Sequence, residues 1–388
     1  MAHTVVIAPD SFKGTIAAAD AAVAIRRGWH AVSPRDVVHL MPMADGGEGT
    51  LAAFEAAVPG ARRMPVSVTG PENTVVAASW LLLPASVEAP RGTGVVELAS
   101  TSGIELLGTP SRLRPLDAHT RGFGEAIAAA LAHGVSRLVL GIGSSASTDG
   151  GAGMLSALGA RLLDAHGDDV ADGGRGLADV ATVDLTGVAA LPPGGVHVLS
   201  DVTNPLLGTG GAAAVFGPQK GASVDQTAEL DAALARFASL VNAADVGSEQ
   251  GRPNSGVELA AMPGAGAAGG TGFGLLVWGA RLVPGSDAVA ELIGLREAVA
   301  SSTVVITGEG SFDGQSAAGK VPAHVSTITA GEAVPVALVA GRITVDADTS
   351  AFAASVSLTE LAGSAEAAMG DPARWLIEAG ATLARRLA

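Results

Sequence analysis

The chain has 388 residues, enough for two domains of ordinary size, and 48% of them are hydrophobic, which provides apolar area for large cores. A net charge of −15 argues against nucleic acid or an anionic membrane as partner, and the absence of cysteine excludes disulfides and thiolate metal sites. We expect no signal peptide, because the first residues lack a charged segment and a long apolar one, and no membrane span, because no apolar run is long enough. We therefore expect a cytoplasmic protein whose partners are small molecules.

The N-terminal segment alternates strands and helices. Residues 4–9 and 37–41 are runs typical of buried strands, and helices are expected over 16–29 and from about 50 to 57. This alternation predicts a parallel sheet covered by helices. Each strand leads into a loop rich in small, acidic and hydroxyl residues, which include Asp10, Ser11 and Lys13 in DSFKGT and Asp45, Gly46, Gly47 and Glu48 in ADGGEGT. A simpler interpretation of the second loop is a helix N-terminus capped by Asp45.

The pattern changes at Met64. Residues 66–68, 74–83 and 94–99 are predicted strands joined by short turns without a helix between them, which indicates an antiparallel region and a second domain. Further along we predict helices over 115–133, from the loop after residue 221 to about 243, and over 275–282. The strands expected in this region cover 137–140 and 196–199.

The βα alternation resumes near residue 287. Helices are predicted over 287–301, 322–330 and 372–387, and strands over 303–307 and 335–340. Because the two ends of the chain resemble each other and the middle differs, we predict a discontinuous α/β domain formed by residues 1–64 and 287–388. Residues 65–286 would then form an inserted domain.

The stretch TVVITGEGSFDGQSAAGKVP, residues 303–322, contains the parts of a phosphate site. A buried strand is followed by glycines whose backbone amides can approach an anion, and by a lysine that supplies a charge. It is not a P-loop, because Val321 stands where a hydroxyl residue would hold Mg²⁺. A surface turn rich in small residues remains the alternative. The candidate residues are Gly308, Glu309, Gly310, Asp313, Gln315, Ser316 and Lys320.

The lysines are few and similarly placed. The 23 basic residues are 20 arginines and three lysines, Lys13, Lys220 and Lys320, and each lysine lies in a predicted glycine-containing loop. A lysine ammonium is a compact charge that the planar arginine fork does not replace at a phosphate. This placement favours phosphate binding over a chance distribution.

Two glycine patterns resemble dinucleotide-binding motifs. GIGSSA at 141–146 follows a strand, with Gly143, Ser144, Ser145 and the nearby Asp149 at a predicted helix N-terminus. GAGAAG at 264–269, with Gly266 and Gly269, lacks the preceding strand. An NAD(P)-dependent oxidoreductase of a small hydroxy acid is therefore one alternative, and a non-catalytic small-acid binding protein is another.

Six carboxylates occur in glycine- or hydroxyl-rich loops: Asp10, Asp45, Asp149, Asp201, Glu309 and Asp313. Each alone would be a common helix or turn cap. Together they match the needs of phosphoryl transfer, which uses Mg²⁺ on carboxylates, cations on phosphates and a carboxylate near the attacking hydroxyl. We predict catalytic roles for Asp201, Asp313, Lys13 and Lys320, and Mg²⁺ ligation by Asp201, Asp313 and Glu309.

Seven blocks, in order, resemble the class I glycerate kinases: APDSFKGT, PMADGGEGT, GIGSSASTDGGAGM, SDVTNPLLG, FGPQKGAS, PGAGAAGGTGFG and GEGSFDGQSAAGKVP. The resemblance implies ATP- and Mg²⁺-dependent phosphorylation of D-glycerate, with 2-phosphoglycerate the favoured product. It also implies a flavodoxin-like α/β domain with a second α/β domain, containing a mixed sheet, inserted in it. The active site is expected in the cleft between them, in a monomer or homodimer.

The resemblance also guides the assignment of ligand contacts, with two departures. Ser311 stands where the family usually has arginine, and residues 144–149 differ from the usual Gly-Ser-Ala-Thr-Asn-Asp. We expect the glycerate site to contain Asp10, Ser11, Asp45, Gly46, Gly47, Glu48, Arg121 and Asn204. We expect the nucleotide site to contain Gly143, Ser144, Ser145, Asp149, Lys220, Gly266, Gly269, Gly308, Glu309, Gly310, Gln315 and Ser316.

Overall fold

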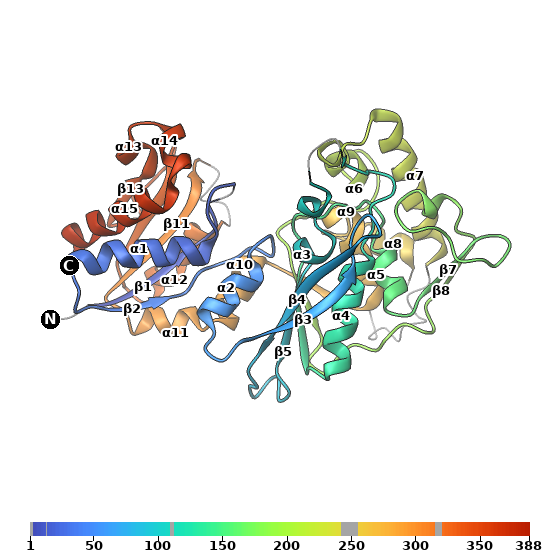
Figure 1. Ribbon diagram of the computed structural model, residues 1–388, viewed down its shortest axis with the longest axis horizontal. Helices are drawn as coiled ribbons and strands as arrows, with labels where there is room; N and C mark the ends of the chain where they lie inside the picture. Colours follow the sequence, from blue (N-terminus) through green and yellow to red (C-terminus); the bar gives the residue numbers. More distant parts are fainter. Residues whose placement is uncertain (1–2, 13, 109–111, 242–254, 315–319) are drawn as a thin grey trace. The chain divides into compact units, whose positions relative to one another are not determined.

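The computed structural model describes residues 3–12, 14–108, 112–241, 255–314 and 320–388 (Figure 1). The chain divides into two compact units. Unit 1 comprises Met1–Asp45, Ala52–Pro59 and Gly285–Ala388, and unit 2 comprises Gly46–Leu51 and Gly60–Pro284. Each unit is built around its own sheet.

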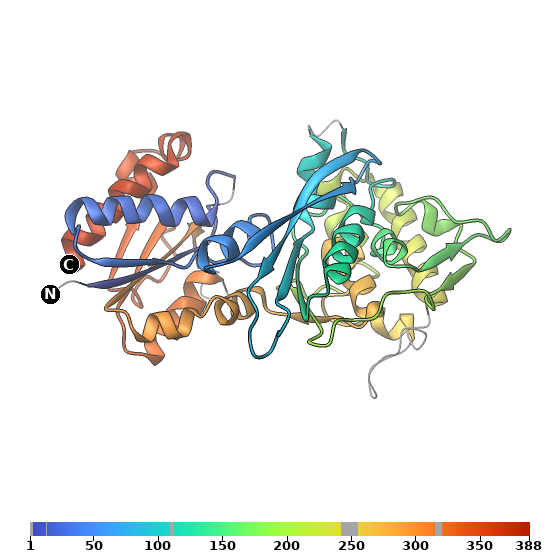
Figure 2. The same cartoon turned by 60° about the horizontal axis from the view of Figure 1, so that its bottom comes forward.

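Unit 1 contains a sheet of five parallel strands in the order β13-β12-β11-β1-β2. Helices lie on both faces of it, with α1 on one face and α11 and α12 on the other (Figure 2). The strands are β1 (Thr4–Pro9), β2 (Val37–Leu40), β11 (Val304–Phe312), β12 (Val336–Ile343) and β13 (Ala354–Ser357). The helices are α1 (Ala18–Val32), α10 (Gly285–Leu292), α11 (Leu295–Ala300), α12 (Val321–Gly331), α13 (Leu358–Ala362), α14 (Ala365–Gly370) and α15 (Pro372–Leu387).

Helices α1 and α15 contact each other closely because glycines face the partner helix. A Cβ on Gly28 would overlap the carbonyl oxygen of Ile377, and one on Gly380 would overlap that of Ile25. Together with the strands they enclose a core that includes Trp29. This packing joins the N-terminal and C-terminal segments of the chain into one unit.

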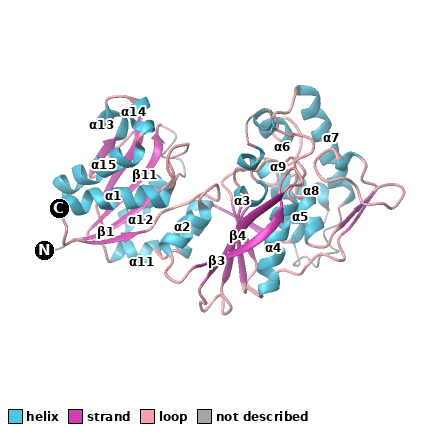
Figure 3. Ribbon diagram, viewed as in Figure 1, coloured by secondary structure: helices cyan, strands magenta, loops and turns pink. Residues whose placement is uncertain are grey.

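Unit 2 contains a six-stranded mixed sheet in the order β10-β9-β6-β5-β4-β3. β5, β6, β9 and β10 are parallel, whereas β3 and β4 are antiparallel (Figure 3). The strands are β3 (Arg62–Thr69), β4 (Val75–Leu83), β5 (Thr93–Glu97), β6 (Arg137–Gly141), β9 (Val196–Leu199) and β10 (Arg281–Val283), with a separate hairpin of β7 (Arg161–Leu163) and β8 (Thr182–Asp184).

The helices of unit 2 cover this sheet and its connections. They are α3 (Ala99–Ser102), α4 (Arg121–His133), α5 (Ala152–Ala157), α6 (Ala212–Phe216), α7 (Val224–Leu240), α8 (Gly256–Ala260) and α9 (Ala267–Trp278), while α2 (Thr50–Ala57) crosses the division between the units. The predicted α/β class is confirmed, and the antiparallel region expected after residue 64 is present as β3, β4 and β5.

Several predicted boundaries differ from the structure for local reasons. The helix predicted over 115–133 begins at Arg121, because the amide of Thr120 is bonded to the carboxylate of Asp149 instead. The helix predicted over 287–301 is two helices, separated where Gly294 adopts a left-handed φ of 70°. The helix predicted over 275–282 ends at Trp278, and strand β10 follows.

Candidate functional site

Strands β1 and β11 are neighbours in the parallel sheet of unit 1, and acidic residues follow their carboxyl ends. Asp10 directly follows β1, and its amide donates to the carbonyl of Gly308 at 2.8 Å. Its carboxylate accepts from the amide of Ser11 at 2.7 Å. Ligands of open parallel sheets bind beyond the carboxyl ends of strands. This edge of the sheet is therefore where chemistry is expected in unit 1.

A lysine lies between two carboxylates at the same edge. The Nζ atom of Lys320 is 3.7 Å from Oε2 of Glu309 and 3.7 Å from Oδ1 of Asp313. The Glu309 side chain is 9% exposed, whereas those of Lys320 and Asp313 are 41% and 36% exposed. We call Asp10, Glu309, Asp313 and Lys320 the unit 1 cluster. It offers a cation and carboxylates to a ligand in solvent.

The glycines at the centre of this stretch are not in a loop, contrary to prediction. Gly308, Glu309 and Gly310 belong to β11, which continues to Phe312 alongside β12. A Cβ on Gly308 would overlap the carbonyl oxygen of Val339. The glycine therefore permits close strand pairing, and its contact with a phosphate stays a prediction. Lys13, Gln315 and Ser316 lie outside the described residues.

In unit 2, the glycines of two motifs contact each other. The amide of Gly143 donates to the carbonyl of Gly46 at 2.9 Å, and a Cβ on Gly143 would lie 2.5 Å from the Cα of Gly47. Gly46 has a φ of 93°, and a Cβ there would overlap the carbonyl oxygen of Leu199. In a dinucleotide-binding motif, such a glycine lets the backbone come close to the pyrophosphate. Here Gly143 comes close to Gly46 and Gly47 instead, which weakens the NAD(P) interpretation.

Glu97, which the sequence analysis missed, lies beside this contact. It ends the buried strand β5, is 5% exposed, and its Oε1 atom accepts from the amide of Gly49 at 2.6 Å. Burial raises its pKa to about 7, and the charge of Glu48 acts in the same direction. The available signal was a lone acidic residue at the end of an apolar strand.

Glu97 also lines a small pocket in unit 2. Its volume is about 150 Å³. The residues around it are Glu48, Gly49, Glu97, Ala99, Ser100, Gly103, Ile104, Glu105 and Ser144. Glu48 and Ser144, two predicted site residues almost a hundred positions apart in the sequence, thus line the same pocket.

Lys220, for which phosphate binding stays a prediction, is buried in unit 2. It is 3% exposed, and its ammonium donates to Oγ of Ser145 at 2.7 Å and to the carbonyl oxygen of Ser147. Burial lowers its pKa to about 7, although the charge of Asp149 opposes this shift. Lys220 therefore holds the 144–149 loop in place.

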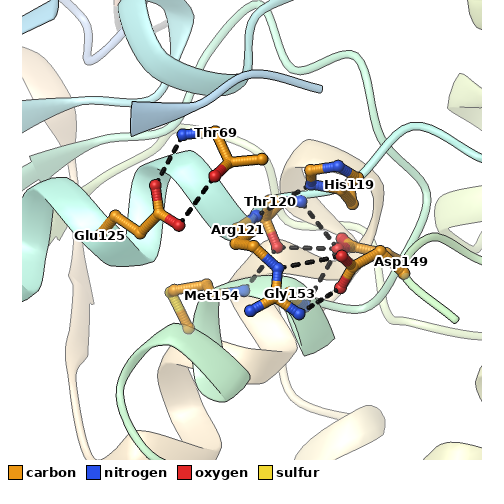
Figure 4. A network of polar contacts seen from close by, with 9 residues as sticks. Thr69, His119, Thr120, Arg121, Glu125, Asp149, Gly153 and Met154 are labelled. Carbon is orange, nitrogen blue, oxygen red and sulfur yellow. Dashed lines mark hydrogen bonds and ion pairs between the residues drawn. The ribbon is translucent and has the colours of Figure 1, made fainter. Parts of the chain in front are cut away.

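Asp149 makes hydrogen bonds within unit 2, and its contact with a nucleotide stays a prediction (Figure 4). It is fully buried. Its carboxylate accepts from the amide and hydroxyl of Thr120 at 2.9 and 2.8 Å and from the amides of Gly151 and Gly153, both at 3.2 Å. These bonds satisfy amides at the starts of α4 and α5.

Arg121, predicted to bind the glycerate carboxylate, forms an ion pair within unit 2. Its Nε and Nη2 atoms donate to the two carboxylate oxygens of Asp172 at 2.9 and 2.8 Å, and this interaction raises its pKa. Asn204 is likewise engaged, because its Nδ2 atom donates to the carbonyl of Gly210 at 2.8 Å. Asp201 is exposed just beyond β9.

The second glycine motif lies inside unit 2. A Cβ on Gly266 would overlap the carbonyl oxygen of Pro205, and one on Gly269, which has a φ of 67°, would overlap that of Ser147 and lie 2.8 Å from Nζ of Lys220. Both glycines thus allow buried segments to meet around Lys220. That they also contact a nucleotide stays a prediction.

No group of three or more histidine or acidic side chains suited to a metal is present among the described residues. Of the predicted Mg²⁺ ligands, Glu309 and Asp313 lie together around Lys320 in unit 1. Asp201 belongs to unit 2. Within the described part of the chain, none of the helices has the length and apolar character of a membrane span.

The fold and these sites define a class: an α/β protein of two units, each with acidic and glycine-rich segments at the carboxyl ends of parallel strands. Comparison with known proteins identifies the family. The model of the glycerate kinase family matches residues 5–388. The chain belongs to the glycerate kinase family, as the seven blocks predicted.

Individual relatives agree. The chain is 41% identical to the glycerate 2-kinase of Escherichia coli K12 over 344 residues, which cover 88% of this chain and 86% of that protein. It is 41% identical to the glycerate kinase of Bacillus subtilis 168 over 346 residues, 89% of this chain and 86% of that protein. A crystal structure named for glycerate kinase 2 of Salmonella typhimurium LT2 has a TM-score of 0.82 at 38% identity, covering 99% of this chain and 98% of that one.

Proposed function

We propose that this enzyme transfers the γ-phosphoryl group of ATP to the 2-hydroxyl oxygen of D-glycerate, forming 2-phosphoglycerate and ADP. The observation that carries the proposal is the match to the Escherichia coli glycerate 2-kinase over 88% of the chain. The unit 1 cluster supports it, because phosphoryl transfer needs a cation near the phosphates and a carboxylate near the attacking hydroxyl.

We propose further that unit 1 is a flavodoxin-like domain, residues 1–64 and 287–388, and that residues 65–286 are a domain inserted in it. Numbered within unit 1, its strands have the order 2-1-3-4-5, which is the doubly wound order of flavodoxin. In that order, the ligand crevice lies between the first and third strands, here β1 and β11. The unit 1 cluster lies at the ends of these two strands.

In this proposal Mg²⁺ enters as MgATP. Mg²⁺ commonly keeps several waters and takes one or two protein carboxylates besides the phosphates, so the pair Glu309 and Asp313 suffices in number. When bound, Mg²⁺ neutralises charge on the phosphates. Lys320 supplies a further positive charge at the same edge, and Asp313 is the candidate acceptor of the glycerate hydroxyl proton.

The test is ADP release in the presence of MgATP and a panel of small hydroxy acids. We expect D-glycerate to give the highest kcat/KM. Direct conversion of the product by enolase, without a mutase, would identify 2-phosphoglycerate. ADP release no higher than that of an ATP-only control, with active coupling enzymes, would rule out the activity.

The same panel separates the two competing functions. Glycerate binding without ADP release would indicate a binding protein. A change of absorbance on mixing NAD(P)⁺ with a hydroxy acid would indicate an oxidoreductase, although the contact of Gly143 with Gly46 and Gly47 speaks against pyrophosphate binding there.

A further inference from the structure

We infer that Glu97 is a positioning residue for the reaction: it holds the Gly46–Leu51 segment, with Glu48, against the carboxyl end of the mixed sheet of unit 2. This inference rests on the proposed function, in which that segment contributes to the substrate site. Glu97 itself stands in no motif on which the assignment of the site relied.

The segment contacts the sheet through its backbone and through a bond to a side chain. The carbonyl of Gly46 accepts from the amide of Gly143 at 2.9 Å, and Gly46 lies closely against Leu199. The third contact is the bond of 2.6 Å from the amide of Gly49 to the Glu97 carboxylate. The first two contacts lie at the entry to the segment, whereas the bond to Glu97 lies near its far end.

The far end is the beginning of helix α2. The amides of Thr50 and Leu51, in the first turn of α2, favour the charged form of Glu97 and so oppose the effect of its burial on the pKa. Glu48 lies between the contacts of Gly46 and the bond of Gly49, and it lines the same pocket as Glu97. Moving the far end therefore moves Glu48.

The bond to Gly49 is sensitive to protonation. Bonds from amides to a carboxylate are stronger than those to a neutral acid. Burial raises the pKa of Glu97 to about 7, and the acidic groups that face it in the pocket are Glu48 and Glu105. The attachment should accordingly weaken when the pH falls below about 7.

The first experiment needs no substrate. Hydrogen exchange of the amides of residues 46–51, corrected for the intrinsic dependence of exchange on pH, is compared at pH 6 and pH 8. In the wild type we expect protection to be about tenfold greater at pH 8. In Glu97→Gln, which keeps an acceptor oxygen and cannot ionise, protection should be the same at both pH values. Wild-type protection that does not change with pH would overturn the inference.

The second experiment measures kcat and KM for D-glycerate against pH. In Glu97→Gln we expect the KM at pH 8 to be about tenfold higher than in the wild type, with kcat within about threefold. The wild-type profile should show an ionisation near pH 7, and the profile of the variant should lack it. The matched control is Glu125→Gln, since Glu125 accepts from the amide of Thr69, also at 2.6 Å, and lines no proposed site (Figure 4). The control should keep the wild-type profile.

The outcomes are distinguishable. A Glu97→Gln enzyme with wild-type KM and pH profile would overturn the positioning role, even if its thermal stability were lowered. Should the wild type show no phosphorylation of glycerate, the proposed function fails, and the exchange experiment alone still decides whether Glu97 holds the segment.

Discussion

Lys220 and Asp149 show at the scale of single residues how burial changes the role of a charged side chain. Both come from motifs that resemble phosphate sites, yet both are buried, and each makes hydrogen bonds within unit 2. Lys220 joins the GPQKGAS segment to the 144–149 loop. A sequence pattern identifies the residue types, whereas burial determines whether a ligand can reach them.

We predict that Lys220 makes stability depend on pH. Its folded-state pKa, lowered to about 7 by burial, lies below the 10.5 of an exposed lysine, so unfolding takes up a proton between these values. The free energy of unfolding of the wild type, relative to Lys220→Met, should therefore rise from pH 7 to pH 9 by about 1.4 kcal/mol per pH unit. Urea unfolding at three pH values measures this. Parallel curves for the two proteins would contradict it.

For the unit 1 cluster we predict that Asp313→Asn lowers kcat by more than about 100-fold, the scale of acid–base or charge-positioning groups. Folding should be retained, because Asp313 is 36% exposed and follows the end of β11. The control is Asp348→Asn, an exposed turn residue of the same unit. Near-normal turnover of Asp313→Asn in the glycerate assay would remove it from the catalytic residues.

At the scale of elements, strand β11 extends beyond the β-branched residues 303–307, because β12 pairs with it up to its last residue. Pairing with β12 runs to Phe312, opposite Ile343, and thus includes the Gly308–Gly310 stretch. As a result, Glu309 and Asp313 occupy defined positions at the end of a central strand. A strand gives more precise positions to such side chains than a loop would.

We predict opposite effects of two alanine substitutions in unit 1. Gly308→Ala places a methyl group against the Val339 carbonyl and should cost about 1–3 kcal/mol of stability through forced backbone shifts. Gly331→Ala, at the end of α12 with nothing within 4 Å, should be neutral or stabilising by up to about 1 kcal/mol. Denaturant melts of both proteins test this, and equal melting midpoints would contradict the role of Gly308 in strand pairing.

At the scale of the whole molecule, lysine is scarce: only three of the 23 basic residues are lysines, and the two in the described residues differ in exposure. Lys320 is 41% exposed and lies among carboxylates, while Lys220 is 3% exposed. The amines of the two lysines should therefore differ in reactivity toward an acylating reagent, and one experiment on the intact enzyme can measure that difference.

We predict that a lysine-selective acylating reagent modifies Lys320 in the native protein and leaves Lys220 unmodified until urea is added. Loss of the Lys320 charge should lower kcat/KM by roughly 30- to 150-fold, and MgATP with glycerate should slow its modification. Peptide mass spectrometry measures the extent of acylation at each lysine, including Lys13. Complete modification of Lys320 with activity intact would exclude it from catalysis.

Much of the fold follows from local sequence. Period-two and apolar runs place β1, β2, β4 and β9 within a residue or two of their observed ends, and the strong amphipathic pattern near the C-terminus places α15. The family follows as well, since seven blocks keep their order along the chain. Short strands such as β7, β8 and β10 are missed, because three residues carry too little periodicity.

For the site residues, too, some properties follow from the sequence and others only from the tertiary structure. Sequence alone determined which residue types occur together in motifs, because the chemistry of a phosphate site restricts composition and local spacing. Only the tertiary structure decided which of them face solvent: it buries Lys220 and Asp149, pairs Arg121 with Asp172, and brings Glu97 to Gly49. The physical reason is that burial and long-range hydrogen bonds depend on which strands become neighbours, and no local pattern encodes that adjacency.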